Sequence, residues 1–175
     1  MRKLVFIGVP ILLISSIGYS YTYTGNTWDK NTVLYKYDSS VPSSYHQSMT
    51  NGADAWLEEN SEFKFEKKAW YQSTENTVYM NDSIDSVAVM TPWVYAGTNE
   101  LSRFRIDFND DLSWSTTAES DKYDVWNVAA HEFGHGLGMG HSSYTDATMY
   151  SQTEKGEREK RYLSQDDVDG VTALY

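Results

Sequence analysis

The hydrophobic pattern of the first two thirds of the chain predicts short β-strands. Residues 32–37, Thr-Val-Leu-Tyr-Lys-Tyr, combine aromatic and β-branched side chains, which is typical of a strand because such side chains pack well on a pleated surface. Four further runs are apolar or alternate between apolar and polar positions, at residues 63–65, 77–80, 86–90 and 104–108. Together these runs predict a mixed sheet.

Apolar residues at helical spacing predict a first helix after the turn signal at residues 41–44. Its expected core-facing stripe consists of Tyr45, Met49, Ala53, Trp56 and Leu57. A second helix is predicted over residues 123–136, and three residues are available to cap its N-terminus: Ser120, Asp121 and Asp124.

A third helix is predicted from Ser164 onward. The segment Ser-Gln-Asp-Asp that begins there matches a capping box. Val168, Val171 and Leu174 are expected to form the buried face of this helix. Because strands precede helices along the chain, the expected architecture is an α+β fold.

The first 20 residues have the pattern of a secretory signal peptide. Arg2 and Lys3 precede an apolar run over residues 4–17, and the small residues Gly18 and Ser20 suit a cut after Ser20. An uncleaved membrane anchor or a buried core helix is the alternative, although the run is short for a bilayer span. We expect a signal peptide at 1–20 and a single domain at 21–175, which is secreted, monomeric and not stably bound to membranes after signal cleavage.

The composition narrows the classes of function. The chain has 25 acidic and 14 basic residues, and loss of Arg2 and Lys3 with a signal peptide would leave 12 basic ones. Such an acidic surface repels nucleic acid and anionic membranes. The chain has no cysteine, which excludes a disulfide framework.

One segment concentrates metal-binding chemistry. Residues 131–141 read His-Glu-Phe-Gly-His-Gly-Leu-Gly-Met-Gly-His. On a helix, His131 and His135 share one face because they lie four positions apart. Gly138 marks the expected end of that helix, since glycine tolerates the left-handed conformation, and His141 can then return as a third ligand. The spacing predicts one catalytic zinc held by three histidines.

Glu132 lies beside these ligands and is the expected catalytic base. Three protein ligands leave a tetrahedral zinc one open position, and a water bound there has its pKa lowered to about 7. We expect Glu132 to take the proton of that water and to pass it to the leaving nitrogen of a cleaved peptide bond. The alternative is a structural zinc site or an inactive enzyme, but a structural site is normally closed by a fourth protein ligand.

This motif and its surroundings resemble the metzincins, and among them the matrixins, or matrix metalloproteinases. The resemblance rests on Ser142 directly after the third histidine, on a Met-turn at residues 147–150, on residues 128–135, and on residues 163–175, which are similar to the family's C-terminal helix. It implies a zinc-dependent endopeptidase that acts on polypeptides. It also implies that Met149 forms a hydrophobic floor beneath the zinc and binds nothing.

The resemblance further implies a twisted, mostly parallel five-stranded sheet with one antiparallel edge strand and three helices. Residues 87–92 are similar to that edge strand. We therefore expect Val87, Ala88 and Val89 to contact an extended peptide substrate, which would bind by strand addition.

Three polar residues stand where the family builds its S1′ pocket, which receives the side chain that follows the cleaved bond. In the matrixins the residue four positions before the first ligand histidine lies at the bottom of this pocket, and here it is Asn127. Ser151 and Thr153 are similar in placement to the wall after the Met-turn. The resemblance therefore implies a wetter pocket, with a preference broader than strict leucine.

The chain departs from the family at its additional metal sites. It has four histidines, and three are assigned to the catalytic zinc, so a second site of three His and one Asp cannot be assembled. Val89 and Asp107 stand where the family usually has structural-zinc histidines, and His46 is expected to be a surface or packing residue.

Calcium is also disfavoured by the sequence. Asp110 and Asp111 resemble a calcium-binding stretch, but Leu112 replaces an expected acid. The expected cofactor is therefore one catalytic zinc.

The sequence thus predicts a secreted zinc endopeptidase, with two alternatives. One is a non-catalytic surface or adhesion module on a zinc-stabilised metzincin scaffold, to which the 14 tyrosines would be suited. The other keeps the hydrolytic zinc but cleaves cell-wall peptide bonds. Zinc content together with cleavage of a quenched peptide separates the first alternative from a peptidase.

Overall fold

The computed structural model describes residues 20–57 and 62–175, and nearly all of the expected signal peptide lies outside these residues. The main sheet has five strands in the order β2-β1-β3-β5-β4. Their bounds are β1 Thr32–Tyr37, β2 Lys64–Lys67, β3 Thr77–Asn81, β4 Ala88–Val94 and β5 Leu101–Asn109. All neighbouring pairs are parallel except β4 with β5, so β4 is an antiparallel edge strand.

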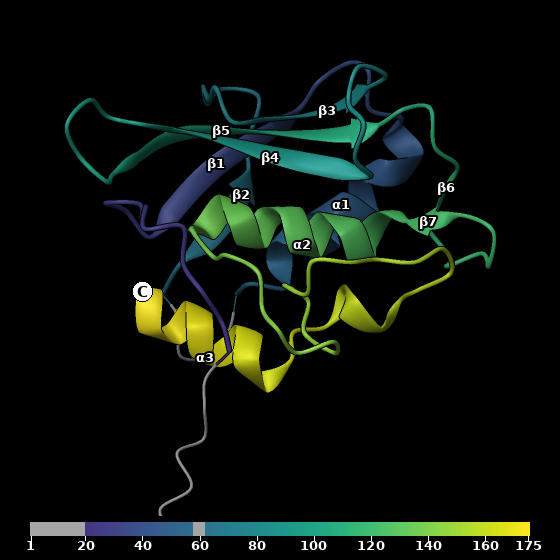
Figure 1. Cartoon of the computed structure of the whole chain (residues 1–175). Helices are drawn as coiled ribbons and strands as arrows, with labels where there is room; N and C mark the ends of the chain where they lie inside the picture. The colour runs from purple at the N-terminus through teal and green to yellow at the C-terminus, as the bar shows by residue number, and fades with distance from the viewer. Residues whose placement is uncertain (1–19, 58–61) are drawn as a thin grey trace, which may run out of the picture.

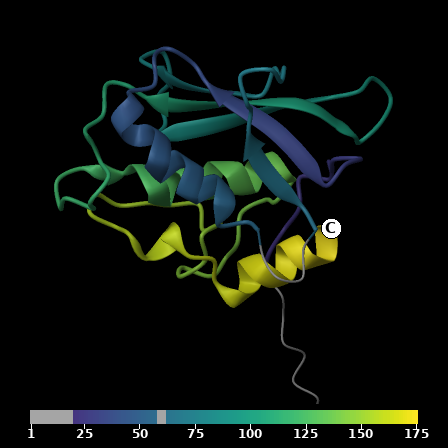
Figure 2. The ribbon, with the colours of Figure 1, turned by 180° about the vertical axis from the view of Figure 1, so that it is seen from behind.

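Three α-helices complete the fold, and two of them cover one face of the sheet. The helices are α1 His46–Asp54, α2 Val125–Leu137 and α3 Gln165–Leu174. Figure 1 shows α2 running beneath β4 and β5, with α3 farther from the sheet, and Figure 2 shows α1 beside α2 under the same face. This arrangement confirms the expected α+β architecture, with its mostly parallel five-stranded sheet, antiparallel edge strand and three helices.

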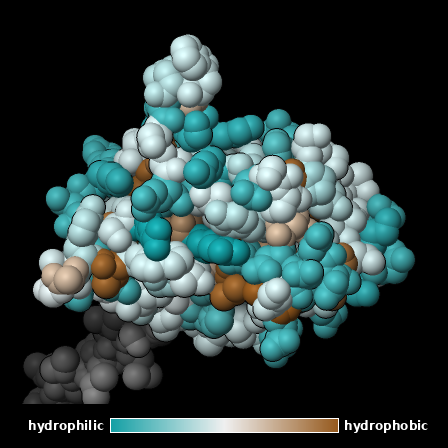
Figure 3. Space-filling model, turned by 90° about the horizontal axis from the view of Figure 1, so that it is seen from above, coloured by the Kyte–Doolittle hydropathy of each residue, from teal (hydrophilic) through white to brown (hydrophobic). Residues whose placement is uncertain are grey.

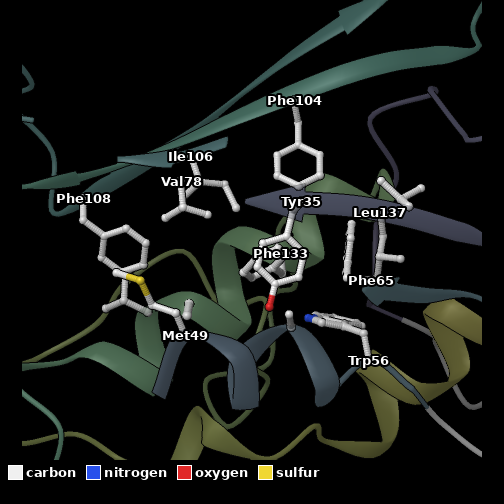
Figure 4. Packing of buried hydrophobic residues seen from close by; sticks show 14 of the residues in the cluster. Tyr35, Met49, Trp56, Phe65, Val78, Phe104, Ile106, Phe108, Phe133 and Leu137 are labelled. Carbon is white, nitrogen blue, oxygen red and sulfur yellow. The ribbon is translucent and has the colours of Figure 1, made fainter. Parts of the chain in front are cut away.

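The core fills the layer between the sheet and the two helices. Figure 4 shows aromatic and aliphatic side chains of β1, β3 and β5 pointing toward those of α1 and α2. Phe104 of β5 and Phe133 of α2 contact edge to face, with ring centroids 5.9 Å apart. Trp56 follows α1, is fully buried, and donates from Nε1 to the carbonyl oxygen of Ala130 at 2.7 Å. This layer fixes α2 against the sheet, because a close-packed core leaves little room for displacement.

Some of the predicted core residues lie closer to solvent than expected. Leu57 is 56% exposed, because α1 ends at Asp54 and the helical spacing no longer applies at residue 57. Val168 is half-buried, as is Leu174, whereas Val171 is fully buried. The Leu57 prediction was therefore wrong.

The second helix also begins later than predicted. Tyr123–Asp124 forms a short strand, β7, which pairs with the strand β6 at Trp114–Ser115. Two short 3₁₀ helices lie outside the three α-helices, η1 at Ser43–Tyr45 and η2 at Glu159–Arg161. The sequence pattern did not predict β6, β7 or η2, since each is too short to establish a period.

The surface seen from above the sheet is mostly hydrophilic, with apolar side chains scattered in small patches (Figure 3). Within residues 20–57 and 62–175, no helix has both the length and the apolar character needed to span a membrane.

Candidate active site

The N-terminus of α2 is fixed by Asp124, one of the three residues expected to cap it. The side chain of Asp124 accepts a hydrogen bond from the backbone N–H of Asn127 at 2.9 Å. It also forms an ion pair with Arg161, with a shortest distance of 2.6 Å. The cap satisfies a backbone donor that the helix leaves free, and the ion pair ties the helix to η2.

Two glycines allow the chain around the site to pack and turn. Gly138 ends α2 with a φ of 107°, and an added Cβ there would collide with the carbonyl oxygen of Asn26. An added Cβ at Gly134 would collide with Met149 and Trp56. Gly138 therefore lets the chain turn toward His141, while Gly134 lets the fully buried Met149 approach the helix.

The turn brings the three predicted ligand histidines together. One ring nitrogen from each of His131, His135 and His141 lies within 4.8 Å of the others. The ring centroids are 4.7 Å apart for His131 and His135, 5.3 Å for His131 and His141, and 4.8 Å for His135 and His141. Among the described residues, this is the one group of three or more such side chains close enough to share an ion.

Backbone carbonyl groups orient the two helical histidines. His131 Nδ1 lies 2.7 Å from the carbonyl oxygen of Thr148, and His135 Nδ1 lies 2.9 Å from that of Met139. Because a carbonyl oxygen accepts, each Nδ1 carries the proton and each Nε2 is left with a free lone pair. Burial lowers the pKa of His131 to about 3 and also lowers that of His135. Both rings are therefore neutral near pH 7, as metal binding requires.

This donor set fits zinc. Neutral imidazole nitrogens are common zinc ligands, and three protein ligands leave one coordination position open for water or substrate. Two of the three rings are already held in the tautomer that directs Nε2 to a metal.

Glu132 lies at the same site with one oxygen unpaired. Its side chain is buried, the backbone N–H of Met90 lies near its carboxylate, and its Oε2 has no hydrogen-bond partner among the described residues. Burial raises the pKa of Glu132 to about 8. A carboxyl group with a pKa near neutrality can both take up and release a proton.

A cleft of about 770 Å³ lies between α2 and the edge strand β4. Its wall includes His131, Glu132, His135 and His141 on one side, and residues 86–90 with Pro92 on the other. Val87, Ala88 and Val89 all line this cleft. The structure therefore brings the predicted strand contacts and the ligand histidines to one cavity.

The pairing of β4 with β5 decides which backbone groups face the cleft. The carbonyl oxygen of Val87 accepts from the N–H of Asn109 at 3.0 Å, so the backbone of Val87 faces β5. The alternation of an antiparallel ladder then turns the backbone of Ala88 and Met90 away from β5. Met90, whose N–H reaches Glu132, is a cleft residue that sequence reasoning missed.

The three residues expected in the S1′ pocket lie together in the same cleft. Asn127, Ser151 and Thr153 all line it, and Asn127 Nδ2 donates to Thr153 Oγ1 at 3.2 Å. Lys160 also lines the cleft and is only 5% exposed. Sequence reasoning missed Lys160, because nothing in a run of charged residues distinguishes the one that is buried.

The other residues considered as metal ligands lie in different surroundings. His46 is half-buried and stacks on Tyr37, with ring centroids 4.3 Å apart. Asp107 is buried on β5 and forms an ion pair with Arg105 at 2.5 Å. Asp110 and Asp111 are exposed in the turn after β5.

Comparisons with known proteins identify the family of this chain. A family model described as Matrixin matches residues 27–175. Similar curated proteins include the interstitial collagenase of Bos taurus, 48% identical over 69 residues, the neutrophil collagenase of Homo sapiens, 44% over 68 residues, and the matrilysin of Homo sapiens, 43% over 68 residues. Each match covers 39% of this chain, and 14%, 14% and 25% of the respective relatives. The chain thus matches a quarter or less of the length of these relatives.

Proposed function

Since this chain belongs to the matrixin family, we propose that it is a secreted zinc-dependent endopeptidase. The observation that carries the proposal is the buried Glu132, whose unpaired Oε2 lies at the site where three histidines share an ion-sized space. A non-catalytic module would gain nothing from an unpaired buried carboxyl oxygen, which costs about 1–3 kcal/mol or more. Secretion is part of the proposal and rests on the signal-like residues 1–20.

In the proposed mechanism, His131, His135 and His141 would hold the zinc, the first two through Nε2. Bound zinc would supply a Lewis-acid centre that lowers the pKa of a water molecule and polarises the peptide carbonyl group. Glu132 accepts the proton of the attacking water at Oε2 and afterwards returns it to the leaving nitrogen. Thr148 and Met139 keep two of the ligand rings in the required tautomer through their carbonyl oxygens.

The proposed substrate is an extended polypeptide that pairs with the edge strand β4. The backbones of Ala88 and Met90 face away from β5, and Val87 and Val89 line the same cleft. An extended peptide that adds to such an edge gains main-chain hydrogen bonds, while its side chains enter adjacent pockets. Met90 would exchange its contact with Glu132 for one with the substrate.

The pocket that contains Asn127, Ser151 and Thr153 is the proposed S1′ pocket. All three residues line the same cleft as His131. The residue that follows the cleaved bond, called P1′, places its side chain in this pocket. The polar side chains of the pocket support acceptance of P1′ side chains other than leucine, since a wholly apolar side chain would leave the buried amide unpaired.

Digestion of a proteome-derived peptide library, read by mass spectrometry with and without a zinc chelator, tests the proposed function. We expect cleavage that stops with the chelator and returns when zinc is added. The Glu132→Ala variant, loaded with zinc, is the matched control and should leave the library intact. Equal cleavage by the variant and the wild type would contradict the assignment of Glu132.

A further inference from the structure

Asn127 lines the cleft and carries a buried acceptor that is unsatisfied. Asn127 lies on α2, one turn before His131, and is only 2% exposed. Its Oδ1 has no hydrogen-bond partner among the described residues. Because buried polar atoms in folded proteins are nearly always paired, an unpaired one needs an explanation, and beside a cleft a donor from a ligand supplies one.

A chain of hydrogen bonds fixes which end of the amide is left free. Asn127 Nδ2 donates to Thr153 Oγ1 at 3.2 Å, and Thr153 Oγ1 donates to Glu157 Oε2 at 3.0 Å. A hydroxyl group has a single proton, so Thr153, once it donates to Glu157, can only accept from Asn127. The amide nitrogen must therefore face Thr153, and the acceptor Oδ1 is the atom that remains for a ligand.

Lys160 holds the side chain of Glu157 in place. The Lys160 ammonium lies 2.8 Å from Glu157 Oε1 and donates to the carbonyl oxygen of Gln152 at 2.5 Å. The Lys160 side chain is 6% exposed and that of Glu157 is 20% exposed, so water screens this pair only weakly. Since the two charges offset one another, the pair gives this end of the cleft no net charge to attract an ionised side chain.

We propose that Asn127 Oδ1 selects a neutral hydrogen-bond donor, the amide side chain of glutamine, at the residue that follows the cleaved bond. The inference rests on the proposed function and deepens it by naming the substrate class. Glutamine has an apolar stem and a terminal NH₂ that can donate to Oδ1. Methionine has nearly the same length but no donor, and glutamate would turn a charged acceptor toward Oδ1.

Peptides that differ only at P1′, with Gln, Met, Glu, Leu or Lys, test the proposal on the zinc-loaded full chain. We expect kcat/KM for P1′ Gln to exceed the values for Met and Glu by at least about tenfold, since a site with a buried acceptor discriminates against analogues that lack the donor. Equal values for Gln and Met would overturn the proposal. A preference for Glu would overturn the proposal and indicate that Lys160 selects the P1′ side chain. A preference for Lys would overturn it and indicate that the exposed Glu154 at the cleft wall does so.

Two variants distinguish an effect of the hydrogen-bond network around Asn127 from an effect of pocket size alone. Thr153→Val is nearly isosteric but removes the hydroxyl group that fixes the amide, so the ratio of Gln to Glu should fall toward one. Asn127→Leu removes the acceptor and should reverse the order of Gln and Met. Thr172→Val, on the exposed face of α3, is the matched control and should keep the wild-type ratios. An unchanged ratio in both pocket variants would refute the role of the network.

Binding of the same peptides to zinc-loaded Glu132→Gln, measured by calorimetry, keeps this inference separate from the proposed function. If the wild type cleaves no peptide but the variant binds P1′ Gln at least about five times more tightly than Met, the proposed activity fails and the pocket preference stands. If the wild type cleaves peptides without any P1′ preference in cleavage or binding, only the inference about Asn127 fails.

Discussion

The buried carboxylate of Asp167 joins the C-terminal helix to the turn that holds His131. Asp167 is fully buried at the third position of α3, where it forms a capping box with Ser164. Its Oδ1 accepts from the N–H of Met149 at 3.0 Å, and its Oδ2 accepts from the N–H of Thr148 at 2.8 Å. The carbonyl oxygen of Thr148 in turn binds His131 Nδ1. Replacement of this single side chain should therefore loosen the Met-turn and one metal ligand together.

Asp167→Asn is the sharpest test, because it changes hydrogen bonding with almost no change in shape. Oδ2 also accepts from the N–H of Ser164 at 2.9 Å and from its hydroxyl group at 2.8 Å, so both carboxylate oxygens receive donors. Either orientation of an asparagine amide would point its NH₂ at a donor and leave at least one buried N–H unpaired, at a cost of about 1–3 kcal/mol. With a weakened cap, worth about 1 kcal/mol, the free energy of unfolding should fall by about 2–4 kcal/mol.

Urea unfolding of the metal-free protein measures this loss, and a zinc titration measures the effect on His131. We expect the variant to unfold at lower urea with an unchanged slope, and to bind zinc more weakly than the wild type. Asp169→Asn on the same helix is the control, because Asp169 accepts from Gln165 Nε2 at an exposed position and should change stability by less than about 0.5 kcal/mol. A stability for Asp167→Asn within that margin of the wild type would refute the reasoning.

Three further variants test the metal site. Glu132→Ala should keep one zinc per chain and lose about two to four orders of magnitude in kcat, as removal of a general base does; near-full turnover with zinc bound would contradict the mechanism. His135→Ala should lose both zinc and activity, because two protein ligands hold zinc poorly, and metal analysis after dialysis checks this. Gly138→Ala should be destabilised by more than about 1 kcal/mol and bind zinc weakly, since its φ of 107° and the carbonyl group of Asn26 leave no room for a methyl group; wild-type zinc affinity would show that the turn tolerates a side chain.

Short-range features of this protein could be predicted from the sequence because they depend on residues within about one helical turn. The four-residue spacing of His131 and His135 and the stop at Gly138 both appear in the structure as expected. So does the capping box at Ser164. The five strands of the sheet also follow from local runs of apolar and β-branched residues, although their ends shift by a few residues. The prediction that Leu57 is buried failed because a stripe at helical spacing does not reveal where the helix ends.

The sequence by itself therefore determined which residues can hold a metal, and its resemblance to the matrixins indicated the sheet and the chemistry. Only the tertiary structure decided which groups surround that chemistry: the buried Asp167 behind the Met-turn, the N–H of Met90 near Glu132, and the network that leaves Asn127 Oδ1 without a partner. Asn127 and Thr153 are 26 positions apart in the chain, and Asp167 and Met149 are 18 apart. Such contacts form only when separate segments pack together. The same packing buries these polar groups, and burial raises the free-energy cost of leaving any of them unpaired.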